Sequence, residues 1–356
     1  MSKKGIFVIA LLLLGAIFVS QKDRILTAVF QKGLEVRLAG DAIAELDDGL
    51  HVALCGAGGP LPGPNASGPC VAVIAGSTMF VVDAGTDGVR NLGRMGFPAG
   101  AIKAVFLTHF HSDHIDGLGE MATIRWVSDA NTEPLPVYGP RGVQQVVSGL
   151  NSVYAMDMTY RHDHHGDTVA PVRGFGMVAK EFAAPEFGKL EVLYDENNLK
   201  IEALRVEHAP VTPAVGYRFT YKGRSVLITG DTIASDNVLK FSQNIDLLVH
   251  EALAPNLVMM MNAAAKKAGN KVLEKITFDI LDYHASPKQA AQIAKDAGVG
   301  HLLYYHIVPP LVVPGQESLF LDGADEIFPD YTVGQDGVMF SMPAGSNDIN
   351  LVRKGL

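Results

Sequence analysis

The feature that most constrains this 356-residue chain is the run THFHSDHIDG at residues 108–117. It places His109, His111, Asp113 and His114 within six positions, directly after the apolar segment AVFL, which is typical of a buried strand. Side chains two positions apart in extended backbone point to the same side, so His109 and His111 can approach one ion. The turn that follows would direct Asp113 and His114 to a second ion. Imidazole nitrogens and carboxylate oxygens are ligands that zinc accepts, so the run predicts a metal centre at a strand end.

Four further His and Asp residues occur at apolar, strand-like runs elsewhere in the chain. They are Asp83 after MFVV, His208 after IEALRVE, Asp231 after VLITG and His306 within LLYYHI. A single histidine at a strand end more often has a structural role, so each position alone is weak evidence. Their order along the chain and their shared placement, taken with the first run, favour one common site.

Strand-like and helix-like patterns fill both halves of the chain. Residues 70–85, CVAVIAGSTMFVVDAG, form two apolar runs separated by a Gly-Ser pair, and Lys222-Gly223 separates two more, so both segments predict hairpins. Ser286 as N-cap and Gly298 near the end predict a helix between them. Strands followed by strands alternating with helices, in two halves, favour an α/β fold of two sheets between outer helices.

The H-x-H-x-D-H run resembles the signature of the metallo-β-lactamase superfamily, and the resemblance covers roughly residues 50–345. It implies a four-layer αββα sandwich. Within the superfamily the chain is most similar to the ribonuclease Z-like branch. The segments HAPVTPAVGYRF, LVHEA and YHASPKQAAQIAKDAGVGHLLYYH carry that similarity.

The resemblance implies two metal ions, with zinc expected and manganese or iron(II) left open. The residues that would bind the first ion are His109, His111 and His208. Those that would bind the second ion are Asp113, His114 and His306, and Asp231 would bridge the two ions. Asp83 matches the aspartate that supports the metal-binding loop in the family.

The resemblance also implies three catalytic residues. A hydroxide held between the two metal ions would attack the substrate, and Asp113 would orient that water or accept its proton. A histidine at the position of His284 donates a proton to the leaving group in this branch, and Glu251 would orient it. A helix-capping or supporting role for His284, which lies just ahead of the expected N-cap, stays open.

The charge of the chain indicates which class of substrate to expect. The formal net charge of −9 argues against a general nucleic-acid binder, whose affinity depends on clustered Lys and Arg. A tRNA-processing member of the branch usually carries a basic arm, whereas residues 151–190 mix Arg161, Arg173 and Lys180 with acidic side chains. We expect that segment to be an irregular insertion forming a lid or substrate wall. These features favour a small-molecule ester, such as a phosphodiester, aryl phosphate or aryl sulfate, and disfavour nucleic acid.

Three other functions stay open. The first is a ribonuclease Z-type endonuclease that processes tRNA 3′ ends, and the second is a β-lactam or lactone hydrolase. The third, from a different class, is a non-catalytic metal-binding surface module. The cluster HDHHGD, with His162, His164 and His165, could bind metal, line the substrate pocket or form a solvated turn.

The N-terminus predicts export. Lys3 and Lys4 precede the uncharged apolar run 5–19, which is typical of a secretory signal. No A-x-A-like cleavage pattern follows, and the run is shorter than the ~20 residues that span a bilayer, so an uncleaved anchor is favoured over a cleaved signal. We therefore expect a membrane-anchored or secreted enzyme in the periplasm or otherwise outside the cytoplasm. The expected organisation is a signal or anchor at 1–22, a linker at 23–48, the hydrolase domain at 49–345 and a C-terminal tail at 346–356.

The chain has two cysteines, Cys55 and Cys70, at the ends of the segment CGAGGPLPGPNASGPC. In an oxidising compartment they could form a disulfide that closes this loop. Two buried free thiols are the equal alternative. The sequence also leaves a homodimer open.

Overall fold

The computed structural model describes residues 21–35, 40–64 and 66–356. The chain divides into two compact units between Ala42 and Ile43. Residues 21–35, which include the last two positions of the expected signal or anchor and the first part of the expected linker, form a helix. Nearly all of the predicted signal or anchor, residues 1–20, lies outside the described residues. Within the described ranges, no helix combines the length and apolar character that a membrane crossing requires.

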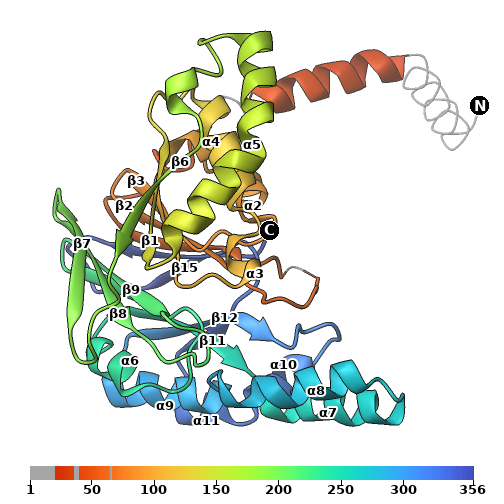
Figure 1. Ribbon diagram of the computed structural model, residues 1–356, viewed down its shortest axis with the longest axis vertical. Coiled ribbons are helices and arrows are strands. Elements are labelled where there is room, and N and C mark those ends of the chain that lie inside the picture. Colours follow the sequence, from red (N-terminus) through yellow and green to blue (C-terminus); the bar gives the residue numbers. More distant parts are fainter. Residues whose placement is uncertain (1–20, 36–39, 65) are drawn as a thin grey trace, which may run out of the picture. The chain divides into compact units, whose positions relative to one another are not determined.

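The second unit contains two β-sheets (Figure 1). In the described residues the first sheet has eight strands in the order β15-β14-β1-β2-β3-β4-β5-β6. Its strands are β1 Gly49–Gly56, β2 Cys70–Ala75, β3 Thr78–Val82, β4 Ile102–Phe106, β5 Leu135–Pro140, β6 Met177–Phe182, β14 Val338–Pro343 and β15 Asn350–Lys354. Strands β3 to β6 run parallel, so the residues that follow β3 and β4 lie at the same edge of the sheet.

The second sheet has seven strands among the described residues, in the order β13-β12-β11-β10-β9-β8-β7. They are β7 Leu190–Glu196, β8 Leu199–Arg205, β9 Val215–Tyr221, β10 Arg224–Ile228, β11 Leu247–Leu253, β12 His301–Val308 and β13 Tyr331–Val333. Strands β10 to β13 are parallel, so β10, β11 and β12 end at one edge. Both hairpins predicted from the sequence, β2–β3 and β9–β10, are confirmed.

The two sheets pack face to face around an apolar core that includes Phe80, Phe106, Tyr217 and Phe219. The Phe106 and Tyr217 rings, from opposite sheets, have centroids 5.3 Å apart. Helices cover the outer faces, which makes four layers in the order αββα (Figure 1). The helices are α2 Gly88–Met95, α3 Ser112–Ile115, α4 Leu118–Ser128, α5 Val143–His165, α6 Asp236–Phe241, α7 Pro255–Lys267, α8 Lys271–Asp279, α9 Pro287–Ala297, α10 Gln316–Leu321 and α11 Ala324–Ile327. The predicted fold class is confirmed.

Helix α9 follows the signals read in the sequence. The Ser286 side chain accepts a hydrogen bond from the Gln289 amide, and the two residues form a capping box. Gly298 ends the helix with the left-handed φ of 64°. Apolar side chains of the helix, including Ala290, Ile293 and Ala294, pack on the outer face of the second sheet.

Two segments differ from expectation. The expected irregular insertion at 151–190 is largely regular, because α5 runs to His165 and β6 follows. Only Val143 and Val147 of that helix are buried, so it lacks the apolar stripe that reveals a helical period in sequence. The expected tail at 346–356 contains β15, an exposed strand paired antiparallel with β14.

Cys55 and Cys70 form a disulfide, with Cα atoms 4.9 Å apart. The bond joins the end of β1 to the start of β2. It therefore closes the Gly- and Pro-rich loop between these strands, which borders the candidate site.

Candidate metal centre and active site

The first sheet delivers one half of the site from the end of β4. His109 and His111 follow the strand in extended backbone, and the single turn of α3 carries Asp113 and His114. The two rings of His109 and His111 lie together, with Nε2 of the former 3.0 Å from Nδ1 of the latter. A strand that ends in one tight turn thus points four polar side chains toward the edge of the sheet.

Asp83, directly after β3, fixes this turn. Its Oδ1 accepts a hydrogen bond from the Thr108 backbone N–H at 2.8 Å, and its Oδ2 accepts one from the Thr108 hydroxyl at 2.8 Å. The same Oδ2 lies 2.8 Å from His114 Nδ1. The Asp83 carboxylate thus fixes Nδ1 as a donor and leaves Nε2 as the ring nitrogen that faces the centre.

The second sheet delivers the other half. His208 lies beyond the end of β8 and its Nδ1 is 2.9 Å from the Tyr283 carbonyl. Asp231 follows Gly230, whose φ of 63° and close approach to Thr108 both favour glycine. His306 lies at an irregularity in the β11–β12 pairing and has a φ of 46°, which turns its side chain out of the strand alternation.

The structure brings all seven sequence-predicted ligand positions together. Asp231 lies between two sets of side chains: its Oδ2 is 3.7 Å from His208 Nε2, and its Oδ1 is 3.4 Å from His306 Nε2. Within each of three groups the ligating atoms all lie within 4.8 Å of one another. The groups are His109, His111, His208 and Asp231; Asp113, His114 and His306; and Asp231, His284 and His306. The assignment of these residues as metal ligands stays a prediction.

Burial sets the protonation of the first group. It lowers the pKa of His109 well below its ordinary value and also lowers the pKa of His111 and His208. The three rings are therefore neutral near pH 7, and a neutral imidazole has a lone pair for a metal ion.

The second group attracts positive charge. Burial opposes charge on His114, but the Asp231 and Asp83 carboxylates outweigh it and raise the pKa of His114 well above its ordinary value. Burial likewise opposes charge on Asp231, yet the neighbouring imidazoles, led by His306, hold the pKa of that carboxyl well below its usual range. Buried carboxylates are normally paired with a positive group or bound to a metal ion.

Unpartnered atoms test whether a metal fits. His114 Nε2, His208 Nε2 and Asp231 Oδ1 are buried and make no hydrogen bond within the described part of the chain, although the first and third are 3.4 Å apart. Buried polar atoms normally have a partner. Imidazole nitrogens with carboxylate oxygens are the donor set of a divalent metal ion, so the residues present fit such an ion.

A second carboxylate–imidazole pair lies beside the centre. Glu251, fully buried in β11, places Oε1 3.0 Å from His284 Nδ1 and also accepts hydrogen bonds from the backbone N–H groups of Thr232 and Ala285. Burial opposes charge on His284, but the Glu251 carboxylate more than offsets it and raises the pKa of His284 to about 9. The ring therefore carries a proton near neutral pH, as a proton donor must.

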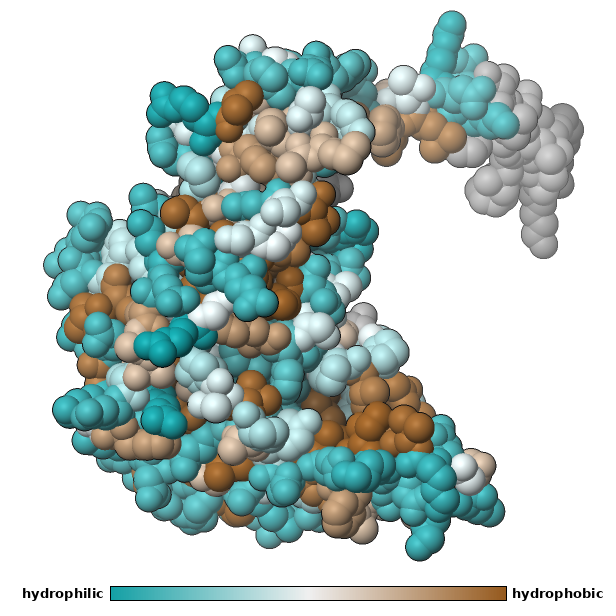
Figure 2. Space-filling model, viewed as in Figure 1, coloured by the Kyte–Doolittle hydropathy of each residue, from teal (hydrophilic) through white to brown (hydrophobic). Residues whose placement is uncertain are grey.

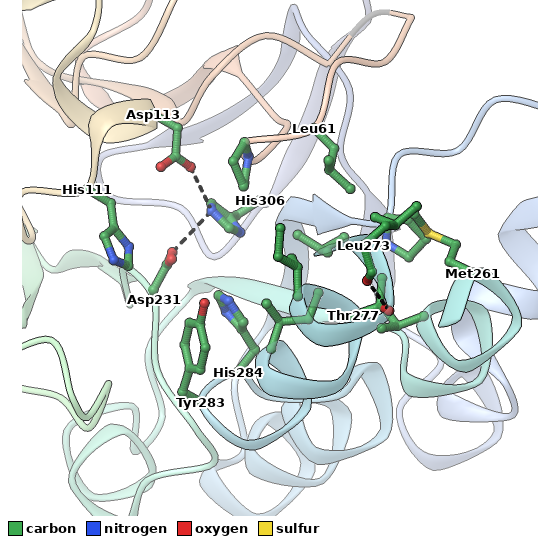
Figure 3. A pocket seen from close by; sticks show the side chains of 16 residues that line it. Leu61, His111, Asp113, Asp231, Met261, Leu273, Thr277, Tyr283, His284 and His306 are labelled. Carbon is green, nitrogen blue, oxygen red and sulfur yellow. Dashed lines mark hydrogen bonds and ion pairs between the residues drawn. The ribbon is translucent and has the colours of Figure 1, made fainter. Parts of the chain in front are cut away.

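The site opens into a cavity of about 260 Å³ (Figure 3). Polar side chains of the centre, among them His111, Asp113 and His284, line one side. The other side is apolar and includes Met261 and Leu273 from α7 and α8. A substrate bound here would meet charged and apolar walls together.

Two contributors were not identified from the sequence. The Thr108 hydroxyl contacts both Asp83 Oδ2 and His109 Nδ1. Thr108 is the first residue of the run THFHSDHIDG, so its position next to the histidines could have identified it. Tyr283 supplies the carbonyl that orients His208, which no sequence pattern reveals because a backbone carbonyl performs that role.

Other histidines have different surroundings. His250, next to Glu251, is fully buried, and its Nδ1 lies 2.7 Å from the Glu251 carbonyl. The cluster His162, His164 and His165 ends α5, where His162 Nδ1 is 3.0 Å from the Ala170 carbonyl. None of the four belongs to a potential metal-binding group found in the described residues.

Comparisons with known proteins agree with this architecture. The family described as the beta-lactamase superfamily domain matches residues 78–307. A ribonuclease Z from Mycobacterium bovis is 34% identical over 271 residues, which cover 76% of this chain and 89% of that protein. The crystal structure of the short form of human tRNase Z has a TM-score of 0.59 at 20% identity and covers 82% of this chain and 99% of that one. A metallo-β-lactamase fold protein from Bacillus subtilis has a TM-score of 0.58 at 22% identity, covering 83% and 100%.

Proposed function

Because the chain belongs to the metallo-β-lactamase superfamily, in its ribonuclease Z-like branch, and is a metal-dependent hydrolase, we propose that it cleaves phosphodiester bonds with a pair of zinc ions. Asp231 would bridge the ions. The remaining ligands would be His109, His111 and His208 for one ion, and Asp113, His114 and His306 for the other. The observation that carries the proposal is the convergence of these groups with the Glu251–His284 pair at one edge of the two sheets.

When bound, such a metal pair supplies an attacking water of lowered pKa and neutralises charge that develops on the phosphoryl group. The chain's own residues do the rest. Asp113 lines the cavity, so its carboxylate can orient a water or accept its proton. His284 holds a proton below about pH 9 and can donate it from Nε2 to the leaving oxygen, while Glu251 keeps Nδ1 protonated and fixes the ring.

The substrate has two candidates. The curated relatives are named ribonuclease Z, so they support cleavage of RNA better than the small-ester substrate expected from charge and export. A small phosphodiester is the second candidate, and the apolar cavity wall beside His284 favours it.

Metal analysis together with a substrate panel tests the proposal. We expect about two metal ions per chain, and hydrolysis of either a precursor tRNA or bis(4-nitrophenyl) phosphate. The variant Asp113→Ala should lose at least a hundredfold in kcat, whereas His164→Ala, an exposed histidine on α5, should match the parent. Fewer than two metals, or full activity in Asp113→Ala, would contradict the mechanism. Precursor tRNA cleavage without diester hydrolysis would select the RNA substrate.

We further propose that the enzyme acts outside the cytoplasm, held by its N-terminal segment. The basic and apolar pattern of residues 1–22 supports this, and so does the Cys55–Cys70 disulfide, since such bonds persist in oxidising compartments. Cell fractionation with thiol labelling tests it. We expect the protein in the membrane or periplasmic fraction, with Cys55 and Cys70 joined in a disulfide and therefore unreactive toward the thiol label. Recovery in the cytoplasmic fraction with both cysteines reduced would refute the proposal.

A further inference from the structure

The hairpin of α7 and α8 stands between β11 and α9, directly before His284 in sequence. Asn262 on α7 joins the two helices, because its Nδ2 donates to the Glu274 carbonyl at 2.6 Å and to the Thr277 hydroxyl at 2.9 Å. Val258 packs with Leu253 of β11 and so attaches the hairpin to the second sheet. The hairpin is therefore a fixed wall of the cavity.

The wall is apolar where it faces the cavity. Val258, Met261, Leu273, Ile276 and Ile280 from the hairpin region line it, opposite Leu61 of the disulfide-closed loop (Figure 3). The Thr277 hydroxyl is already engaged with the Leu273 carbonyl at 2.6 Å. No Lys or Arg of the described chain lines the cavity, so a phosphate or a charged group would find no cation on this wall.

We propose that this cavity is the leaving-group subsite and that it takes an apolar aryl or alkyl alcohol; this inference rests on the proposed phosphodiesterase activity. The position of His284 indicates which part of the substrate occupies the cavity. It borders both the metal centre and the apolar wall, and the group to which it gives its proton is the leaving oxygen. The carbon skeleton attached to that oxygen therefore lies against Met261, Leu273 and Ile276.

The size of the cavity agrees with an aromatic group. A buried apolar cavity of ~150 Å³ holds benzene in another protein, so about 260 Å³ has room for a larger ring system. A second apolar hollow shares Leu61, Met261 and Pro309 with the first and extends it outward. Figure 2 shows apolar surface gathered over this region, and the unbranched, adaptable side chain of Met261 suits ligands of varied shape.

The opposite side of the loop has a different character. A groove of about 460 Å³ also reaches Asp113, but polar side chains such as Ser67, Thr86 and Arg94 line it. The two sides of the attacked phosphorus thus meet different surroundings. The retained group faces polar atoms, and the departing group faces apolar ones.

A matched set of diesters tests the subsite. Methyl 2-naphthyl phosphate, methyl phenyl phosphate and methyl 6-sulfo-2-naphthyl phosphate share the retained methyl group and differ in the leaving aryl alcohol. With the zinc-loaded full chain, kcat/KM should be about tenfold higher for naphthyl than for phenyl, and the sulfonate should abolish that preference. Calorimetric binding of 2-naphthol to the same protein gives a readout that needs no hydrolysis.

Two variants and two controls locate the effect. Met261→Gln and Ile276→Gln should reduce the naphthyl-to-phenyl ratio about fivefold and weaken 2-naphthol binding to the same extent. Met259→Gln and Val272→Gln, on the same helices, change side chains outside the cavity lining that are 50% and 70% exposed, and should leave both quantities unchanged.

The outcomes separate the two proposals. Hydrolysis with no naphthyl preference, or equal ratios in Ile276→Gln and Val272→Gln, overturns the subsite and leaves the phosphodiesterase intact. A different result would be that 2-naphthol binds, that Ile276→Gln weakens this binding, and that no diester is hydrolysed. That result would support the apolar subsite and refute the phosphodiesterase activity.

Discussion

Two carboxylate–imidazole pairs border the candidate metal centre, one from each half of the fold. Asp83 Oδ2 lies 2.8 Å from His114 Nδ1, and Glu251 Oε1 lies 3.0 Å from His284 Nδ1. Both carboxylates are buried, both also accept backbone N–H donors, and both raise the pKa of their histidine. By local geometry alone the two pairs are nearly interchangeable.

The two pairs differ in the surroundings of the histidine Nε2 atom. His114 Nε2 is fully buried and lies 3.4 Å from Asp231 Oδ1 and 3.7 Å from Asp113 Oδ2. The His284 side chain retains 7% exposure and borders the cavity. Under the proposed function, the same pair would therefore orient a metal ligand in one place and prepare a proton donor in the other. The surroundings of Nε2 decide which role results.

Removing the proposed proton donor should have the largest effect. His284→Asn should lower kcat about 10²–10⁴-fold, since that is the usual contribution of general acid catalysis, while metal content stays at the parent level. The loss should be smaller for 4-nitrophenyl esters, whose leaving group needs little protonation. Steady-state kinetics with metal analysis provide the measurement, and His301→Asn, which bonds Thr332 away from the centre, is the control. Loss of metal in His284→Asn would place this residue with the ligands instead.

Asp83→Asn should produce the converse result. The amide has one acceptor oxygen and no charge, so it cannot serve both the Thr108 N–H and His114 Nδ1 as the two carboxylate oxygens do. Metal affinity should therefore fall about 10–100-fold, and excess zinc should restore most activity. Asn tolerates the left-handed φ of 58° at this position. Asp87→Asn is a matched control because Asp87 also has a left-handed φ, 63°, but its side chain is 45% exposed. Competition with a chelator measures the affinity; an unchanged value would remove Asp83 from any role in metal binding.

The fold was predictable where sequence periodicity and capping agree. Helix α9 has an N-cap, a capping box and a terminal glycine, and it was predicted with its bounds. Helix α5 was not, because an exposed helix has no apolar stripe to reveal its period. Strand β15 was missed for a related reason: its edge position leaves both faces exposed.

The site was predictable where its residues follow strands in a compact run. His109 to His114 need only local backbone to come together. His306 has a left-handed φ at a bulge, which depends on the pairing of β12 with β11 and cannot be read from LLYYHI. The apolar wall was not anticipated, since the α7–α8 hairpin meets the centre only through tertiary packing.

Glu251→Gln should change the pH dependence more than the maximal rate. In the parent enzyme the pKa of His284 is raised to about 9, so its proton is present below that pH and lost above it. Without the carboxylate, burial lowers the pKa to its ordinary value of about 6.5 or below. The alkaline limb of the kcat profile should therefore move down by at least about 2.5 pH units, with about a thirtyfold loss at pH 8. A profile that keeps its limb near pH 9 would show that another group donates the proton.

Thr108→Val should have the smallest effect and should act on the Asp83 side alone. The substitution keeps the shape and the backbone N–H bond to Asp83 Oδ1 but removes the hydroxyl that donates to Oδ2 at 2.8 Å. Asp83 is then held by one bond fewer, and metal affinity should weaken two- to tenfold, less than in Asp83→Asn. The pH profile should keep its limb near 9, because His284 is untouched. Thr123→Val, buried on α4 with its hydroxyl bonded to the Gly119 carbonyl, should leave both properties unchanged. A shifted pH profile in Thr108→Val would mean that the two pairs are coupled through Asp231 and do not act independently.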